Sequence, residues 1–188
     1  MGQGKLNIGL ASACATLALS LPASVAGRSG CAHANQAATS APTPAMQQAT
    51  VCLINQQREA RGLPAVRVSA KLNTVAQRWT QHMVTHDQFS HARFIPRIDA
   101  VHYPWQVAAE NIATGYLTPR AAVAAWMASP DHCRNLLDPS VRDVGTGERP
   151  APVRHWASSP ATWTQDFGLR ADQPPPSHNR APAARCPY

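Results

Sequence analysis

The run Ala109-Glu110-Asn111-Ile112-Ala113 and the run Trp126-Met127-Ala128-Ser129-Pro130-Asp131-His132-Cys133-Arg134-Asn135 are the most informative parts of this 188-residue chain. Each run places a titratable side chain, Glu110 or His132, close to a polar Asn and to apolar residues. A third polar marker, Ser90-His91, precedes them. Three titratable groups held near one another can bind a metal ion or move a proton. The sequence therefore predicts a site built on His91, Glu110 and His132.

The two ends of the chain differ in composition from its middle. Residues 1–26 hold one cation, an apolar stretch and then small residues, which is typical of a secretory signal peptide. The apolar stretch is short and rich in Ala and Ser, which argues against a membrane anchor. Residues 27–42 are expected to form a linker, and the proline-rich residues 171–188 an extended tail. The chain then folds as one domain over 43–170 and is secreted without a transmembrane segment in its mature form.

Capping residues and apolar stripes predict three helices before the main strands. The first covers about 44–61, the second starts at Ser69, and the third starts at Thr118-Pro119. Apolar residues recur at spacings of three and four along the second helix, which indicates one buried face. Ser129-Pro130 is expected to end the third helix, and the Ser129 side chain to cap the turn that holds His132.

Strand-like residues follow at 141–146 and 162–167, and in the second stretch they alternate along the chain. Helices that come first and strands that come later are typical of an α+β fold. Two tryptophans in predicted loops, Trp105 and Trp156, are candidates for lining a groove.

Cysteine content indicates disulfides. Loss of the signal peptide would remove Cys14 and leave four cysteines, which in an exported protein indicate two disulfides with three connectivities. We expect Cys52 to pair with Cys133, because Cys52 lies in the first predicted helix and Cys133 follows the His132 that the site needs fixed. Cys31 and Cys186 would then join the two tails.

The charge pattern argues against a nucleic-acid partner. The formal net charge is +7, and its positive residues are scattered rather than gathered into the stripe or patch that tracks phosphates. A solvated basic surface is the simpler interpretation, and anionic cell-envelope polymers or lipid headgroups are the other.

Six runs, in their order along the chain, resemble the bacterial secreted branch of the CAP superfamily, whose domains are also called SCP or PR-1-like domains. Besides the two runs above they are Leu53 to Leu63, Phe89-Ser90-His91, Val144 to Gly147, and Trp163 to Phe167. The resemblance covers about residues 46 to 170. It implies that the α+β fold is a three-layer α-β-α sandwich, with a small sheet between helical layers.

The resemblance also assigns residues to a central cavity. His91 and His132 match the two histidines of that cavity, and Glu110 matches its first glutamate. The second glutamate has no counterpart and would fall near Ser129. We therefore expect the cavity to be lined by His91, Glu110, Asn111, Ser129 and His132.

This set of side chains supports more than one chemistry. Two imidazoles, from His91 and His132, and one carboxylate are an ordinary ligand set for Zn²⁺. Alternatively, Glu110, Asn111 and the histidines only hydrogen-bond one another and hold the loops over the sheet. Ser129 lies three residues from His132, but spacing alone does not make a nucleophile and base.

Three functions compete. The first is an extracellular binding module whose cavity holds a metal, lipid or cell-envelope component, as the resemblance implies. The second is a metal-assisted hydrolase or peptidase that uses His91, Glu110 and His132, with Glu110 or Ser129 as the catalytic group. The third is a structural surface protein whose cavity has no ligand.

Overall fold

A computed structural model of the chain describes residues 30–174 and Cys186. The signal peptide expected at residues 1–26 and most of the expected tail lie outside the described residues. The described elements, in chain order, are η1 (Ala38–Ser40), α1 (Thr43–Glu59), β1 (Arg67–Val68), α2 (Ala70–Thr85), α3 (Phe94–Asp99), β2 (Trp105–Thr114), α4 (Pro119–Met127), α5 (Pro130–Leu137), β3 (Asp143–Arg149) and β4 (Thr162–Arg170). Within these residues, no helix has both the length and the apolar character needed to cross a membrane.

The sheet has four strands in the order β1-β3-β4-β2. The short strand β1 runs parallel to β3, whereas β3 and β2 both run antiparallel to β4. Strand β4 therefore lies in the interior of the sheet, and β2, which carries Glu110, lies at one edge. Besides its pairing with β4, strand β2 contacts α4 and α5.

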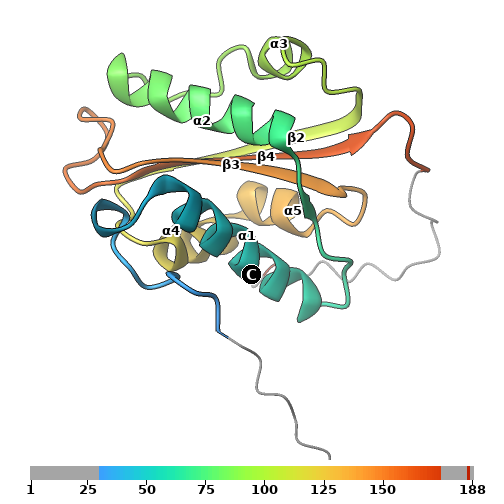
Figure 1. Cartoon of the computed structure of the whole chain (residues 1–188), viewed down its shortest axis with the longest axis horizontal. Helices are drawn as coiled ribbons and strands as arrows, with labels where there is room; N and C mark the ends of the chain where they lie inside the picture. The colour runs from blue at the N-terminus through green and yellow to red at the C-terminus, as the bar shows by residue number, and fades with distance from the viewer. Residues whose placement is uncertain (1–29, 175–185, 187–188) are drawn as a thin grey trace, which may run out of the picture. The chain divides into compact units, whose positions relative to one another are not determined.

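The sheet separates two helical layers (Figure 1). Helices α2 and α3 cover one face, with α2 packed along β3 and β4, while α1, α4 and α5 cover the other face. The main hydrophobic core lies between the second layer and the sheet, around the fully buried side chains of Trp126, Trp163 and Phe167. The expected α+β fold with three layers is confirmed.

The starts of α2 and α4 agree with the capping signals, whereas no side-chain cap hydrogen bond forms at the start of α1. Ser69 precedes α2 and its hydroxyl accepts a hydrogen bond from the Leu72 backbone N–H at 3.4 Å. Thr118 caps α4 in the same way through the Ala121 N–H at 3.1 Å. The expected apolar stripe of α2 is buried, because that face packs on the sheet.

Two glycines allow α2 to approach β3 closely. A Cβ added at Gly145 would lie 2.0 Å from the Leu72 carbonyl carbon, and one added at Gly147 would lie 2.3 Å from the Ala76 carbonyl oxygen. Only a residue without a side chain leaves room for the helix backbone at these positions. The helix is consequently seated directly on the strand.

Strand β2 was not expected from the sequence, and neither was the short helix α3. Strand β4 was expected, but the two alternating sets of residues along it are both buried, because helices cover both faces of the sheet. An interior strand loses the contrast between an apolar and a polar face.

The expected disulfide pairing is wrong. Cys31 is bonded to Cys52, with Cα atoms 5.6 Å apart, and Cys133 is bonded to Cys186, with Cα atoms 6.0 Å apart. The expectation rested on Cys52 lying in the first predicted helix and on Cys133 directly following His132. In the fold, Cys52 of α1 instead lies against the segment that precedes α1.

That preceding segment is part of the folded domain, although residues 27–42 were expected to form a linker. Ala34 and Ala38 are buried in the main core. The Ala38 N–H donates to the Leu117 carbonyl at 2.9 Å, and the Arg120 N–H donates to the Ala34 carbonyl at 3.0 Å. Together with the disulfide at Cys31, these bonds attach the segment to α1 and α4.

Candidate functional site

Glu110 lies near the middle of β2 and is almost buried, with 7% of its surface exposed. Its Oε1 accepts from Nδ1 of His91 at 2.8 Å. The guanidinium of Arg97 meets both oxygens, with Nη1 to Oε2 at 2.8 Å and Nη2 to Oε1 at 3.0 Å. A buried carboxylate requires such partners, and a two-point contact with Arg is the strong form of the pair.

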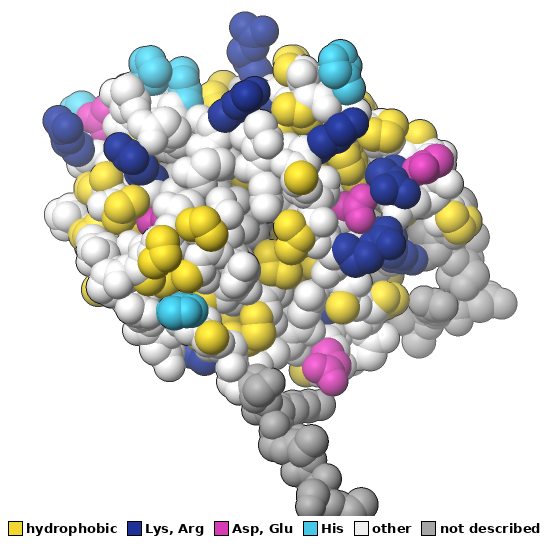
Figure 2. All heavy atoms as spheres, in the orientation of Figure 1, with side chains coloured by type: hydrophobic (Ala, Val, Ile, Leu, Met, Phe, Trp, Pro, Cys, Tyr) yellow, Lys and Arg dark blue, Asp and Glu magenta, His cyan; other side chains and the backbone are white. Residues whose placement is uncertain are grey.

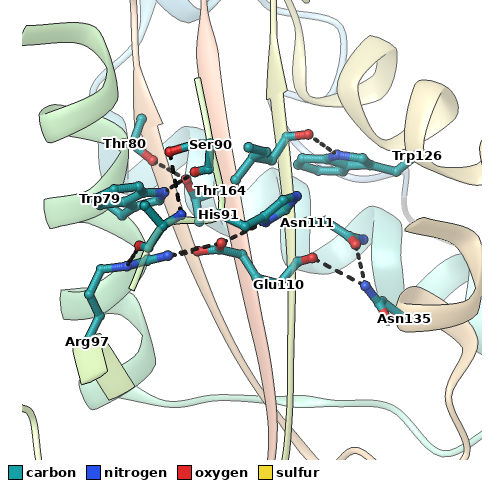
Figure 3. Close-up of polar contacts among 12 residues, drawn as sticks. Trp79, Thr80, Ser90, His91, Arg97, Glu110, Asn111, Trp126, Asn135 and Thr164 are labelled. Atoms are coloured by element: carbon teal, nitrogen blue, oxygen red, sulfur yellow. Dashed lines mark hydrogen bonds and ion pairs between the residues drawn. The ribbon is translucent and has the colours of Figure 1, made fainter. Parts of the chain in front are cut away.

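Arg97 is itself held from several sides. Its guanidinium lies 3.9 Å from the centre of the Trp79 ring, an attractive cation–π arrangement. Its Nε donates to the Ala92 carbonyl at 3.1 Å. The Trp79 indole N–H in turn donates to the Ser90 carbonyl at 2.9 Å, so α2 also anchors the loop that carries His91 (Figure 3).

Asn111 occupies the opposite face of β2 and connects the strand to α5. Its amide donates to the His132 carbonyl and to Gln165 Oε1, both at 3.1 Å. Asn135 completes the connection, since its amide donates to Asn111 Oδ1 at 2.9 Å and to the Glu110 carbonyl at 3.2 Å. Asn111 is 0% exposed. It therefore positions the backbone at His132 from beneath.

Two pockets meet at the residues singled out in the sequence. A polar pocket of about 460 Å³ is lined by His91, Glu110, Ser129 and His132, with Asn135 beside them. The fold brings together four of the five predicted cavity residues at one pocket, and Asn111 lies beneath it.

The second pocket, of about 310 Å³, is more apolar. Its walls include the aromatic side chains of Phe89, Tyr116, Trp126 and Trp156. Trp156 is 63% exposed, and its ring lies 5.4 Å from that of Phe89, centre to centre. Ser129 and His132 line both pockets, so the two pockets lie next to each other. Trp156 thus lines a groove, as expected for this loop tryptophan. Trp105 does not lie in a loop but is the first residue of β2.

Two titratable groups near the site have shifted pKa values. Burial lowers the pKa of His132, the nearby His91 lowers it further, and Asp131 opposes the shift. Asp166 of β4 lies directly opposite Glu110 in the sheet and is fully buried. Burial, and then the Glu110 carboxylate, raise the pKa of Asp166 well above its ordinary value. Asp166 therefore holds its proton more tightly than an ordinary aspartate does.

The arrangement does not fit the zinc site that the residue types allow. Both Glu110 oxygens are engaged by Arg97, and Nδ1 of His91 is turned toward the same carboxylate. Across residues 30–174 and Cys186, no group of three His, Cys, Asp or Glu side chains is placed to hold a metal ion. The buried Glu110 carboxylate instead balances the partly buried guanidinium of Arg97.

Ser129 has no partner that would activate it. It occupies the N-cap position of α5. The expected hydrogen bond, in which a backbone N–H of the helix donates to the Ser129 hydroxyl, is not formed. In the described part of the chain, no hydrogen bond joins Ser129 to His132. A serine nucleophile requires a base within hydrogen-bond reach, which this geometry does not supply.

Sequence reasoning missed Arg97 and Asp166. Arg97 belongs to α3, a helix of six residues whose pattern is too short to recognise. The usable signal was indirect, because an acidic residue in an apolar run such as that around Glu110 must find a donor. Nothing in the sequence marks Asp166 as the cross-strand neighbour of Glu110, since that depends on the register of two strands.

Comparison with known proteins identifies the family of the chain. The model of the cysteine-rich secretory protein family, CAP, matches residues 51–167. The uncharacterized protein YkwD of Bacillus subtilis is 30% identical over 136 residues, which cover 69% of this chain and 50% of that protein. The chain thus spans about half the length of this relative.

Solved structures share the fold. An extracellular protein containing a SCP domain from Bacillus anthracis superposes with a TM-score of 0.61 at 24% identity, over 68% of this chain and 41% of that chain. An outer surface protein from Borrelia burgdorferi superposes with a TM-score of 0.57 at 19% identity, over 64% of this chain and 89% of that chain. At these identities the likeness concerns the fold alone.

Proposed function

Because the chain belongs to the CAP family, we propose that it is a secreted binding module whose two neighbouring pockets hold an amphiphilic lipid or cell-envelope component. The observation that carries the proposal is that an aromatic pocket and a polar pocket share Ser129 and His132 in their walls. An amphiphile has an apolar part and a polar part, and these two compartments match them.

The aromatic compartment would supply most of the affinity. Phe89, Tyr116 and Trp156 contribute large apolar surfaces to it, and Trp156 is mostly exposed. Covering such rings with a ligand removes apolar area from water, the dominant favourable contribution to association. An exposed tryptophan that forms a pocket wall is the kind of residue that binding would cover.

The polar compartment would fix the orientation of the ligand. His91 is half exposed, and His132 and Asn135 line the same pocket, so imidazole and amide groups face the space available to a headgroup. The Glu110 carboxylate is balanced by Arg97 and adds little repulsion. A few polar groups at the end of an apolar pocket are the usual source of specificity.

The binding module is better supported than a metal-assisted hydrolase. The hydrolase needs Glu110 as a metal ligand or general base, whereas both of its oxygens are held by Arg97. A version that used Ser129 as the nucleophile would also need a base hydrogen-bonded to it, and none is present in the described residues.

Titration with a dansyl-labelled fatty acid, followed by calorimetry, tests the proposal. Trp156→Ala is expected to raise the dissociation constant about tenfold or more, because one aromatic wall is lost. Leu117→Ala, which also removes exposed apolar surface but lines neither pocket, is the matched control and should leave affinity unchanged. Equal affinity of wild-type protein and Trp156→Ala would contradict the proposal.

Export is a separate part of the proposal with its own test. The signal-like residues 1–26 and the two disulfides support it, since disulfides persist in oxidising compartments. Mass spectrometry of the protein from culture medium should find a start near residue 27 and four cysteines without free thiols. An intact Met1 on protein retained in cells would refute export.

A further inference from the structure

A third pocket, of about 480 Å³, lies at the end of the sheet where β1 and β3 begin and β4 ends. It shares no lining residue with the two pockets of the candidate site. Its walls come from five separate parts of the fold, which are β1, the start of α2, the segment before β2, the start of β3, and the end of β4. Any ligand here would thus be independent of the amphiphile site.

Three cations converge on this pocket from different elements. Arg67 comes from β1, Lys71 from the first turn of α2, and Arg170 from the end of β4. Figure 2 shows Lys and Arg side chains gathered, with acidic side chains among them, at the right of the view, where β4 ends in Figure 1. The positive charge is thus locally concentrated, although the sequence shows it as scattered.

The two acidic residues of the pocket are already partnered. Asp143 accepts from the Tyr103 hydroxyl at 3.0 Å and from Nη2 of Arg67 at 3.5 Å. Asp172 accepts from Nε of Arg170 at 3.0 Å. The three cations therefore exceed the two carboxylates that line the pocket.

The cations keep unused donors. In the described part of the chain, the Arg67 and Arg170 side chains each make one hydrogen bond, whereas a guanidinium carries five N–H groups. Lys71 uses one of its three donors, on the His102 carbonyl at 2.7 Å. Guanidinium forks with free N–H groups match the oxygens of a phosphate.

The position of Lys71 adds a second argument. The first turn of α2 contains no acidic residue and does contain this lysine. The amino end of a helix carries partial positive charge, so a cation there is unfavourable on its own. A bound anion would offset both charges, and a phosphate monoester brings almost two negative charges at neutral pH.

We propose that the pocket formed by Arg67, Lys71 and Arg170 binds a phosphate group of an organic phosphate. The group could belong to a lipid headgroup or to a soluble or polymeric phosphate ester, because the recognition chemistry is the same. Val68, which is 55% exposed at this pocket, would contact the organic part of either ligand.

Calorimetric titration with glycerol 3-phosphate tests the site directly. Arg67→Gln combined with Lys71→Gln is expected to weaken binding about tenfold or more, since two charge-assisted contacts are lost. Arg170→Gln, which leaves the Asp143 contacts intact, should weaken binding in the same direction. Circular dichroism confirms that each variant is folded.

Arg78→Gln is the matched control for Arg170→Gln, because it also removes one positive charge. Arg78 is exposed and lies outside the pocket, about two turns beyond Lys71 along α2. Equal weakening by Arg78→Gln would show that only the overall charge of +7 attracts the anion, and it would overturn the proposal. Absence of saturable binding to the wild-type protein would also overturn it.

Vesicles distinguish the two ligand sources. A lipid headgroup is assigned if the wild-type protein binds phosphatidylcholine vesicles that contain phosphatidic acid but not pure phosphatidylcholine vesicles. Arg170→Gln must also abolish this vesicle binding. Binding of glycerol 3-phosphate without vesicle binding assigns a soluble or polymeric ester. The fatty-acid probe should bind the Arg67→Gln and Lys71→Gln variant normally, so failure of one proposal is separable from failure of the other.

Discussion

Arg97 contacts both oxygens of Glu110, at 2.8 and 3.0 Å, while its guanidinium stacks on Trp79. The pair joins α3 to the edge strand β2, and the Trp79 contact extends the connection to α2. A carboxylate held in this way stabilises the local structure and is not free to bind a metal. The candidate site is thus supported by an ion pair between buried Glu110 and partly buried Arg97, which the sequence alone did not reveal.

Removing the cation of this pair should destabilise the protein. Arg97→Met is expected to lower the free energy of unfolding by about 3 kcal/mol, because Glu110 would remain buried without a compensating charge. Urea denaturation measures this loss. Arg134→Met is the control, since Arg134 and its partner Asp131 are both exposed, and its effect should stay below about 1 kcal/mol. Similar losses in both variants would contradict the assigned role of Arg97.

Asp166 should make stability depend on pH. Its pKa is raised in the folded state by burial and by Glu110, so the folded protein holds a proton that the unfolded chain releases above pH of about 4. The contribution of Asp166 to stability is therefore fully present below that pH, and it is lost as the pH rises toward the folded pKa.

Asp166→Asn removes this titration. The variant should gain stability relative to wild type as the pH rises above about 4, by at most about 1.4 kcal/mol per pH unit. Denaturation curves between acidic and neutral pH measure the difference. Asp172→Asn, at an exposed position, is the control. A difference in unfolding free energy between Asp166→Asn and wild type that stays constant with pH would refute the assignment.

The close approach of α2 to β3 predicts intolerance of a methyl group at Gly147. Gly147→Ala would place a carbon 2.3 Å from the Ala76 carbonyl oxygen, a backbone atom that cannot rotate away. The expected cost is about 2 kcal/mol or more in the free energy of unfolding. Gly30→Ala, where nothing lies within 4 Å of the added carbon, should be neutral. Thermal denaturation of both variants gives the comparison.

The two disulfides should differ in their contribution to stability. In the chain-entropy account, the Cys133–Cys186 bond closes a loop of 53 residues and contributes about 4 kcal/mol. The Cys31–Cys52 bond closes 21 residues and contributes about 3 kcal/mol. Paired Cys→Ala variants, compared by denaturation, measure each contribution. Non-reducing peptide mapping tests the connectivity itself, and a Cys52–Cys133 peptide would contradict it.

The elements predicted correctly depend on neighbouring residues. Ser69 and Thr118 mark helix starts because their hydroxyls reach an N–H only three residues away. The apolar stripe of α2 follows from the helical repeat. Strand β2 was not predicted because its buried and exposed residues do not alternate along the chain. Its burial depends instead on contacts with α4 and α5.

The family, the α+β class, the main helix starts and the residues that gather at the polar pocket could be predicted from the amino-acid sequence alone. Which donor neutralises Glu110, which acid lies opposite it, and which cysteines pair depend on tertiary contacts. The tertiary structure also brought Arg67, Lys71 and Arg170 to one pocket, although nearly a hundred residues separate Lys71 from Arg170. Local signals arise from hydrogen bonds within one or two helical turns, whereas these partners meet through strand register and the packing of layers, which no local pattern encodes.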